Sequence, residues 1–182
     1  MFKQFVAAAA TFFGLSLTAA AGNATVFGQE IGVTTYQTVA DQLGRATPLR
    51  DAGTNAYSKG RMLESDGSGL NIEGLSKVLF IFDTQDKLVA TLLTLPKGPM
   101  NDNVAPTISM LKRKYRAVRI QQPFVGDVEA RFEQGSSVVA LNAPHMSFDM
   151  NVTYMTRQFE QSYLSAQRAE TERQKRHREA SF

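Results

Sequence analysis

The chain has 182 residues, of which 43% are hydrophobic, and its formal net charge is +3. This length allows one domain with a substantial core, and the apolar content is typical of a folded protein rather than a disordered one. The chain contains no cysteine. Disulfides, thiol catalysis, cysteine-based zinc sites and a lipid anchor on a cysteine are therefore excluded.

The positive charge is concentrated at the end of the sequence. From Arg168 onward the chain holds five basic and three acidic residues, and Lys3 near the start contributes one more positive charge. The remaining residues are balanced in charge, so the high isoelectric point does not predict a nucleic-acid-binding body.

The first 21 residues have the pattern of a secretory signal peptide. Lys3 is followed by an uncharged apolar run over residues 5–17 and then by three small residues ending at Ala21. We expect cleavage after Ala21, with Ala24 as the alternative. The other interpretation is a membrane anchor, but the apolar run is shorter than the roughly 20 residues that a spanning helix needs. The short leader and the absence of cysteine favour the periplasm of a Gram-negative bacterium, or secretion.

Residues 22–95 form the first predicted unit, which consists of a helix and an antiparallel meander. The helix is predicted over residues 35–43, with Thr34 as its N-cap, Gln37 as the reciprocal partner and a left-handed Gly44 at its end. Short strands are expected near residues 55–58 and 61–64. The strongest signal is residues 78–95, two apolar runs around the polar sequence DTQDK, which predict a central hairpin.

A Pro-, Gly- and Asn-rich linker over residues 96–103 precedes the second predicted unit, residues 104–155. Its helix is indicated by a stripe at Val104, Ile108, Leu111 and Tyr115. Extended segments follow at residues 118–120, 124–132, 137–143 and 146–155. In the second interval and the last one the alternation is clear, and it places one set of side chains on a buried face: Val128, Ala130, Phe132, Phe148, Met150, Val152 and Tyr154.

Residues 156–182 are predicted to form a C-terminal helix and a basic tail. Phe159, Tyr163 and Ala166 give a short apolar face, whereas no apolar face exists from Gln167 onward. We expect the start of this helix to dock on the sheet and its end to project into solvent.

The sequence TTYQTVADQLG at residues 34–44 precedes KVLFIFDTQDKLVA at 77–90, and ISMLKRKYRAV at 108–118 precedes strands that end in NVTY at 151–154. This order resembles the β-lactamase-inhibitor-protein-like fold, which is shared with a small lipoprotein of the outer-membrane assembly machinery and with secreted bacterial proteins of the same plan. The resemblance implies an α+β fold of two tandem helix-plus-antiparallel-meander units, packed as one domain with a C-terminal helix. It also implies a binding module. The lipidated cysteine of the lipoprotein and the disulfides of the inhibitors are absent, so anchoring to the outer membrane is not implied.

Candidate catalytic and ligand sites are weak. His145, with Asp127, Asp149 and Ser147 or Ser137, could form a hydrolase triad, but no nucleophile elbow accompanies it and a structural histidine is the favoured interpretation. Asp83 and Asp86 flank a turn but lack the ligand ladder of a calcium loop. Gly67, Gly69 and Gly74 do not have the context of a dinucleotide-binding loop. We therefore expect no catalytic residue, no metal and no cofactor.

Two groups of basic residues form a candidate patch for an anionic partner, although a solvated helix face and a frayed, solvated tail are the favoured interpretations. The residues are Lys112, Arg113, Lys114, Arg116, Arg119, Arg173, Lys175, Arg176 and Arg178.

The sequence therefore predicts a non-catalytic protein-interaction module of the periplasm, with a protein partner in the cell envelope. It would bind through an exposed sheet face or through the basic helix and tail. One alternative is a periplasmic hydrolase that uses His145. The other is a binder of anionic envelope surfaces, including membranes, through residues 112–119 and the tail; nucleic acid is not expected as a partner.

Overall fold

The computed structural model describes residues 22–180, so the predicted signal peptide lies outside the described residues. The first half of the described chain contains one helix and six strands. They are β1 (Thr25–Val26), β2 (Gln29–Glu30), α1 (Tyr36–Leu43), β3 (Arg50–Thr54), β4 (Lys59–Ser65), β5 (Lys77–Asp83) and β6 (Leu88–Pro96). The second half contains α2 (Val104–Lys114), β7 (Arg116–Gln121), β8 (Val128–Gln134), β9 (Ser137–Ala143), β10 (Asp149–Thr156) and α3 (Arg157–Glu179).

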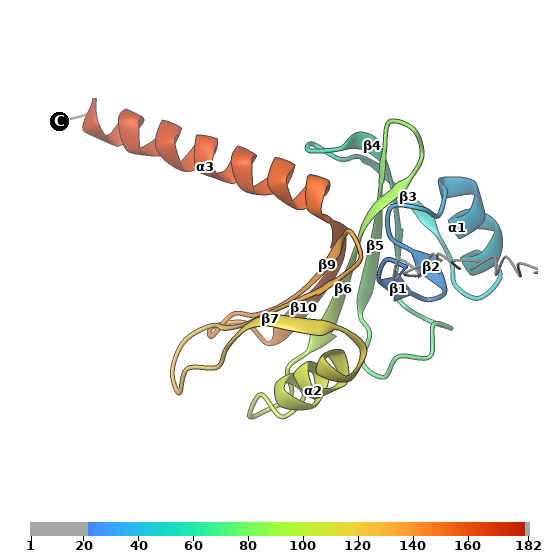
Figure 1. The fold of residues 1–182 in the computed structure, drawn as a ribbon, viewed down its shortest axis with the longest axis horizontal. Helices are drawn as coiled ribbons and strands as arrows, with labels where there is room; N and C mark the ends of the chain where they lie inside the picture. Colours follow the sequence, from blue (N-terminus) through green and yellow to red (C-terminus); the bar gives the residue numbers. More distant parts are fainter. Residues whose placement is uncertain (1–21, 181–182) are drawn as a thin grey trace, which may run out of the picture.

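Eight strands form one antiparallel sheet in the order β3-β4-β5-β6-β10-β9-β8-β7, while β1 and β2 pair separately. The two meanders meet at β6 and β10, whose register runs from Pro96 opposite Asp149 to Ala90 opposite Met155. Figure 1 shows α1 and α2 on one side of the sheet and α3 on the other. The molecule is therefore α+β, as the sequence predicted.

The main core lies between the sheet and the helices α1 and α2. The central hairpin contributes Phe80, Phe82 and Leu88, which are fully buried. Helix α2 contributes the stripe that its sequence predicts, and Val39 and Leu43 come from α1. Full burial of each large apolar side chain stabilises the fold by about 1.5–3 kcal/mol, so this layer provides most of the hydrophobic stabilisation.

A smaller cluster on the opposite face holds the start of α3. Phe159 packs there with Ile81, Ala90, Val138 and Met155 from four neighbouring strands. This prediction of a docked first turn is confirmed, and Thr156 caps the helix by accepting a hydrogen bond from the Phe159 N–H at 3.1 Å.

An ion-pair network fixes the same helix from the side. Arg131 of β8 pairs with Glu160 in the first turn of α3, and this hydrogen-bonded partner raises the pKa of Arg131. Glu133 pairs with Arg157 at 3.1 Å and with Arg116 at 2.5 Å. The beginning of α3 is thus joined to the β7–β8 edge by charge as well as by apolar contact.

Of the two short strands predicted in this region, the one near residues 55–58 is wrong. Residues 55–58 form the turn between β3 and β4, because the Asn55 side chain accepts hydrogen bonds from the N–H groups of Tyr57 and Ser58 at 2.9 and 3.0 Å. An asparagine side chain that bonds the following backbone favours a turn over a strand. The second predicted strand lies within β4.

The ends of α1 also differ from the prediction. Thr35, not Thr34, is the N-cap and accepts a hydrogen bond from the Thr38 N–H. The Thr34 hydroxyl instead accepts one from the Glu30 N–H at 2.9 Å, which ties the helix to the β1–β2 hairpin. Gly44 is right-handed, with a φ of −62°, and its N–H continues the helical hydrogen bonding to Ala40.

Two strands begin later than predicted. β8 begins at Val128 and β10 at Asp149, so Phe124 and Phe148 lie in loops, and Phe148 is not on the buried face where it was predicted. Gly126, with a φ of 125°, turns the chain before β8. A turn closed by the Ser147 N–H donating to Pro144 O at 3.1 Å precedes β10.

Candidate interaction surface at the loop end of the sheet

Three loops meet at one end of the sheet, which we call the loop end. They are residues 97–103 between β6 and α2, residues 122–127 between β7 and β8, and residues 144–148 between β9 and β10. Because β6, β7 and β9 finish at this end of the antiparallel sheet and β8 and β10 begin there, the loops become neighbours. Binding residues are often carried on loops that a rigid scaffold positions in this way.

Lys97 joins the first loop to the third. Its side chain is 4% exposed, and its Nζ donates hydrogen bonds to Pro144 O at 2.6 Å and His145 O at 3.5 Å. Its backbone N–H donates to Phe148 O at 2.9 Å. A buried ammonium is costly unless it is hydrogen-bonded, so these carbonyl groups are what allow Lys97 to lie inside.

Asp127 joins the second loop to the third, since its Oδ1 accepts a hydrogen bond from the His145 N–H at 2.7 Å. The first loop is also fixed internally. Asp102 Oδ1 accepts from the Met100 N–H at 2.7 Å, and Asn103 Nδ2 donates to Pro96 O at 3.1 Å. The three loops therefore form one hydrogen-bonded platform.

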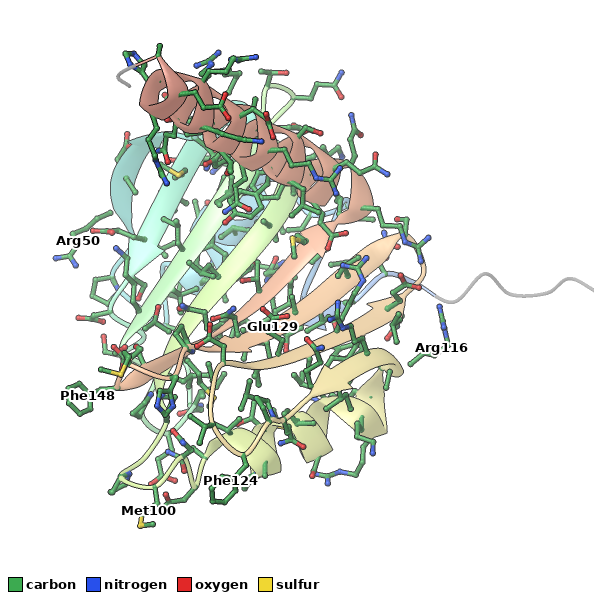
Figure 2. All side chains as sticks on the ribbon, turned by 90° about the vertical axis from the view of Figure 1, so that its left-hand side faces the viewer. Arg50, Met100, Arg116, Phe124, Glu129 and Phe148 are labelled. Atoms are coloured by element: carbon green, nitrogen blue, oxygen red, sulfur yellow. The ribbon has the colours of Figure 1, made fainter. Side chains whose placement is uncertain are left out.

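This platform presents large apolar side chains to solvent, which we call the apolar tips. Phe124 is fully exposed, and the exposed fractions of the other four are 93% for Phe148, 91% for Met146, 85% for Met100 and 67% for Val125. Figure 2 shows Met100, Phe124 and Phe148 at the same end of the molecule, pointing outward.

The apolar tips are distinct from the other exposed apolar residues of the described chain. Those others, such as Val33, Val118 and Leu164, expose half of their surface or less and are scattered over different elements. Single exposed apolar side chains are ordinary, whereas a gathered and ordered set marks an interaction site.

The charged side chains exposed on these three loops and at the start of β10 are acidic, while Lys77 at the same end of the sheet is paired with Glu64 at 3.1 Å. Asp102, Asp127 and Asp149 are all exposed, and we call them the acidic rim. Lys97 points inward to backbone carbonyl groups. The exposed side chains of these loops therefore combine large apolar groups with carboxylates.

The structure does not assemble the triad that includes Ser137. Ser137 begins β9 and the loop with His145 follows its other end, so the length of the strand, roughly 20 Å, separates them. The Ser137 hydroxyl donates to Gln134 O and accepts from the Ala24 N–H. His145 bonds through its backbone, donating its N–H to Asp127 and accepting from Lys97, and Ser147 Oγ accepts from the Asp149 N–H at 3.0 Å. These groups shape the loop.

The other weak candidates have structural roles as well. Asp83 Oδ1 accepts from the N–H groups of Gln85 and Lys87, which closes the hairpin turn, and Asp86 pairs with Arg61 at 2.7 Å. Over residues 22–180 no group of three or more metal-ligating side chains is found. Gly67, Gly69 and Gly74 have positive φ angles within the loop that connects β4 and β5.

The predicted basic patch is divided into two groups. Lys112, Arg113 and Lys114 occupy the last turn of α2, and Arg116 and Arg119 follow on β7. The other four residues lie in the outer part of α3, on the opposite side of the sheet (Figure 1). Arg116 is already paired with Glu133, and Arg173 lies 4.0 Å from Glu170.

Sequence reasoning missed the apolar tips, although a signal for them is present. Each of the three loops contains a proline followed within two residues by a large apolar residue, in the sequences PM, PFV and PHM. Large apolar residues inside proline-bounded loops have no strand or helix face on which to be buried.

No protein-family model matches this chain, and neither a curated protein nor a solved structure matches it. The resemblance drawn from the sequence therefore remains a prediction. Within the described part of the chain, no helix has the length and apolar character needed to cross a membrane.

Proposed function

We propose that this protein is a non-catalytic interaction module that binds a protein partner through the apolar tips. The observation that carries this proposal is the gathering of five highly exposed apolar side chains on loops that hydrogen bonds hold together. Exposing these side chains to water lowers solubility and gives no stability to the fold, so a binding role explains their position.

The energetics support binding through so small a surface. Burying one exposed phenylalanine or methionine side chain is worth about 1.5–3 kcal/mol. Association costs rotational freedom and the ordering of loops, and a loop that is already ordered reduces the second cost. The bonds from Lys97 and to Asp127 provide this order before any partner arrives.

The proposed location is the periplasm or the extracellular space, after removal of the signal peptide. The contacts of residues 22–24 support cleavage after Ala21 rather than after Ala24. The Asn23 N–H donates to Glu30 at 2.8 Å, Asn23 Oδ1 accepts from Ser136, and the Ala24 N–H donates to Ser137. Cleavage after Ala24 would remove all of these, so mass spectrometry of the mature protein should give Gly22 as its first residue.

The finer architecture belongs to the same proposal. A helix followed by four antiparallel strands occurs in each half of the chain, as α1 with β3–β6 and as α2 with β7–β10. We interpret these halves as two tandem units that share one sheet. In this interpretation the apolar tips come from the second unit and from the connection between the units.

The test is photo-crosslinking in the native cell, with a photoreactive phenylalanine analogue at position 124. We expect a discrete adduct with one protein, and we expect Met146→Ser combined with Phe148→Ser to abolish it. The matched control carries the analogue at position 33, which is an exposed apolar site outside the loop end. Equal adducts from both positions, or an adduct that survives the double substitution, would show that the apolar tips are not the binding surface.

A further inference from the structure

We infer that the surface recognised by the apolar tips is an apolar protein surface bordered by lysine and arginine side chains. This inference rests on the proposed function and adds the chemistry of the partner. It is carried by the acidic rim, because Asp102 and Asp127 lie on the loops that carry the tips, Asp149 directly follows Phe148, and the one lysine of the platform is buried.

The rim carboxylates are positioned and also available. Asp102 and Asp127 each use Oδ1 to accept one backbone N–H, and in both residues the second oxygen has no hydrogen bond to a described residue. The side chain of Asp149, the first residue of β10, is also exposed. A cation on the partner can therefore reach these carboxylates without disturbing the loops.

The same charges argue against two other occupants. An anionic membrane would bring lipid phosphates close to three aspartates, and like charges in an interface oppose binding. A symmetric pairing of two copies through the apolar tips would bring each acidic rim against itself. A partner with apolar side chains and cationic neighbours satisfies both parts of the surface.

The acidic rim can be removed without removing its hydrogen bonds. The triple variant Asp102→Asn, Asp127→Asn and Asp149→Asn keeps an accepting oxygen at each position and changes only the charge. A matched control is Asp41→Asn, Asp51→Asn and Asp66→Asn. These three exposed aspartates also accept hydrogen bonds through Oδ1, from Gln37, Gly53 and Ser68, and lie outside the three loops of the platform.

The probe is a pair of amphipathic peptides with the same leucine face, one with lysine and one with glutamate on its polar face. Binding to the full chain is measured by titration calorimetry at low and at 0.5 M salt, the latter being roughly three times physiological ionic strength. We expect the leucine–lysine peptide to bind and the leucine–glutamate peptide not to bind. The rim variant should bind about tenfold more weakly, as expected for three exposed charge pairs, and the control variant should bind as the wild type does.

Several outcomes overturn the inference. They are equal binding of both peptides, no binding of the leucine–lysine peptide, or equal affinity of the rim and control variants. Binding to phosphatidylglycerol vesicles that requires Phe124 and Phe148 would assign a membrane instead, and sedimentation of a dimer that Phe148→Ser disrupts would assign a second copy.

Failure of the proposed function is distinguishable from these outcomes. If the cellular crosslink at position 124 persists in the rim variant at wild-type yield, the module binds through its apolar tips without charge selection. If the crosslink itself is absent, the proposed function fails as well.

Discussion

At the scale of single residues, Lys97 is the side chain on which the order of the loop end depends. Its ammonium group meets carbonyl oxygens of the loop at residues 144–148, and its own backbone N–H bonds to the same loop. A lysine in this position adds charge to the interior, so its value lies in joining two loops.

We predict that Lys97→Met lowers the free energy of unfolding by about 1–3 kcal/mol, the usual cost of leaving a buried hydrogen-bonding group without its partner. Hydrogen exchange in residues 144–148 should become faster. Urea denaturation and hydrogen exchange measure the two effects, and Lys112→Met, on the exposed end of α2, is the control. Unchanged exchange in the loop would contradict the role given to Lys97.

Tyr154 makes the free energy of unfolding depend on pH in the alkaline range. Burial raises the pKa of the Tyr154 phenol above its ordinary value, and burial also raises the pKa of Tyr115, whose ring lies 6.1 Å away. In the unfolded chain a phenol loses its proton at about pH 10. Above this pH the unfolded state binds fewer protons than the folded state, so the free energy of unfolding falls as pH rises.

We therefore predict stability that is fully present below about pH 10 and declines above it, as the linkage relation requires. Tyr154→Phe should make the decline above about pH 10 shallower, because one of the two buried phenols is gone. Urea denaturation at a series of pH values measures this. Tyr57→Phe, which removes an exposed phenol, should decline as the wild type does; a Tyr154→Phe profile parallel to the wild type would refute the assignment.

Residue patterns predicted burial well wherever the backbone stayed in a strand or helix. The alternation of Val128, Ala130 and Phe132 against charged neighbours is confirmed. Phe148 continues the alternation of Met150 and Val152 by one step and yet is exposed, because the sheet ends at Asp149. Where a sheet stops depends on the neighbouring strand and loop, and a local pattern does not contain that information.

At the scale of elements, α3 consists of a docked beginning and a projecting end. Phe159 and Tyr163 contact Tyr57 edge-to-face at centroid distances of 6.4 and 5.2 Å. From residue 164 onward the helix is exposed, and Figure 1 shows it leaving the body of the molecule. The stability of its attachment must therefore come from the first turns.

We predict that removing residues 168–182 changes the free energy of unfolding by no more than about 0.5 kcal/mol, as for other exposed surface. Phe159→Ala should lower the free energy of unfolding by about 3 kcal/mol or more, the usual loss for a buried phenylalanine. Chemical denaturation of the two variants measures the difference. A truncation that costs as much as Phe159→Ala would show that the projecting end contributes to the fold.

The existence of most elements was predictable from the sequence, whereas some boundaries were not. Both helices with apolar stripes, the central hairpin and the C-terminal helix follow from periodicity and turn residues. The β3–β4 hairpin was misplaced because the strand β3, with the sequence RDAGT, lies at the edge of the sheet and carries no apolar alternation. An edge strand forms because its neighbour offers hydrogen bonds, which its own sequence does not reveal.

At the scale of the whole molecule, the pairing of β6 with β10 makes one body from the two halves. Leu93 and Val152 are opposite each other in this pair, and both are buried in the main core. The sequence could not reveal this seam, because the pairing joins segments separated by more than fifty residues and nothing local specifies it. Residues 96–103, predicted as a boundary between units, connect two parts of a single sheet.

We predict that the two halves unfold together, in one transition, because neither half can lose its inner strand without exposing core of the other. Val152→Ala should lower the protection against hydrogen exchange equally in β4 and in β8, which lie on opposite sides of the seam. Val152→Ala should lower the free energy of unfolding by about 1–3 kcal/mol, within the range for truncating a buried side chain. The control is Val118→Ala on the exposed edge strand β7, which should leave protection in both strands unchanged.

The alternative is a pair of units that fold separately and only touch at β6 and β10. In that case urea denaturation followed by a probe in each half would give two midpoints, and Val152→Ala would lower protection in β7–β10 alone. A single unfolding midpoint for both halves has a consequence for the proposed interaction surface. The apolar tips arise from loops 97–103, 122–127 and 144–148, so their arrangement depends on both sides of the seam. Weakening the seam should then weaken partner binding, even though neither Leu93 nor Val152 lies at the loop end.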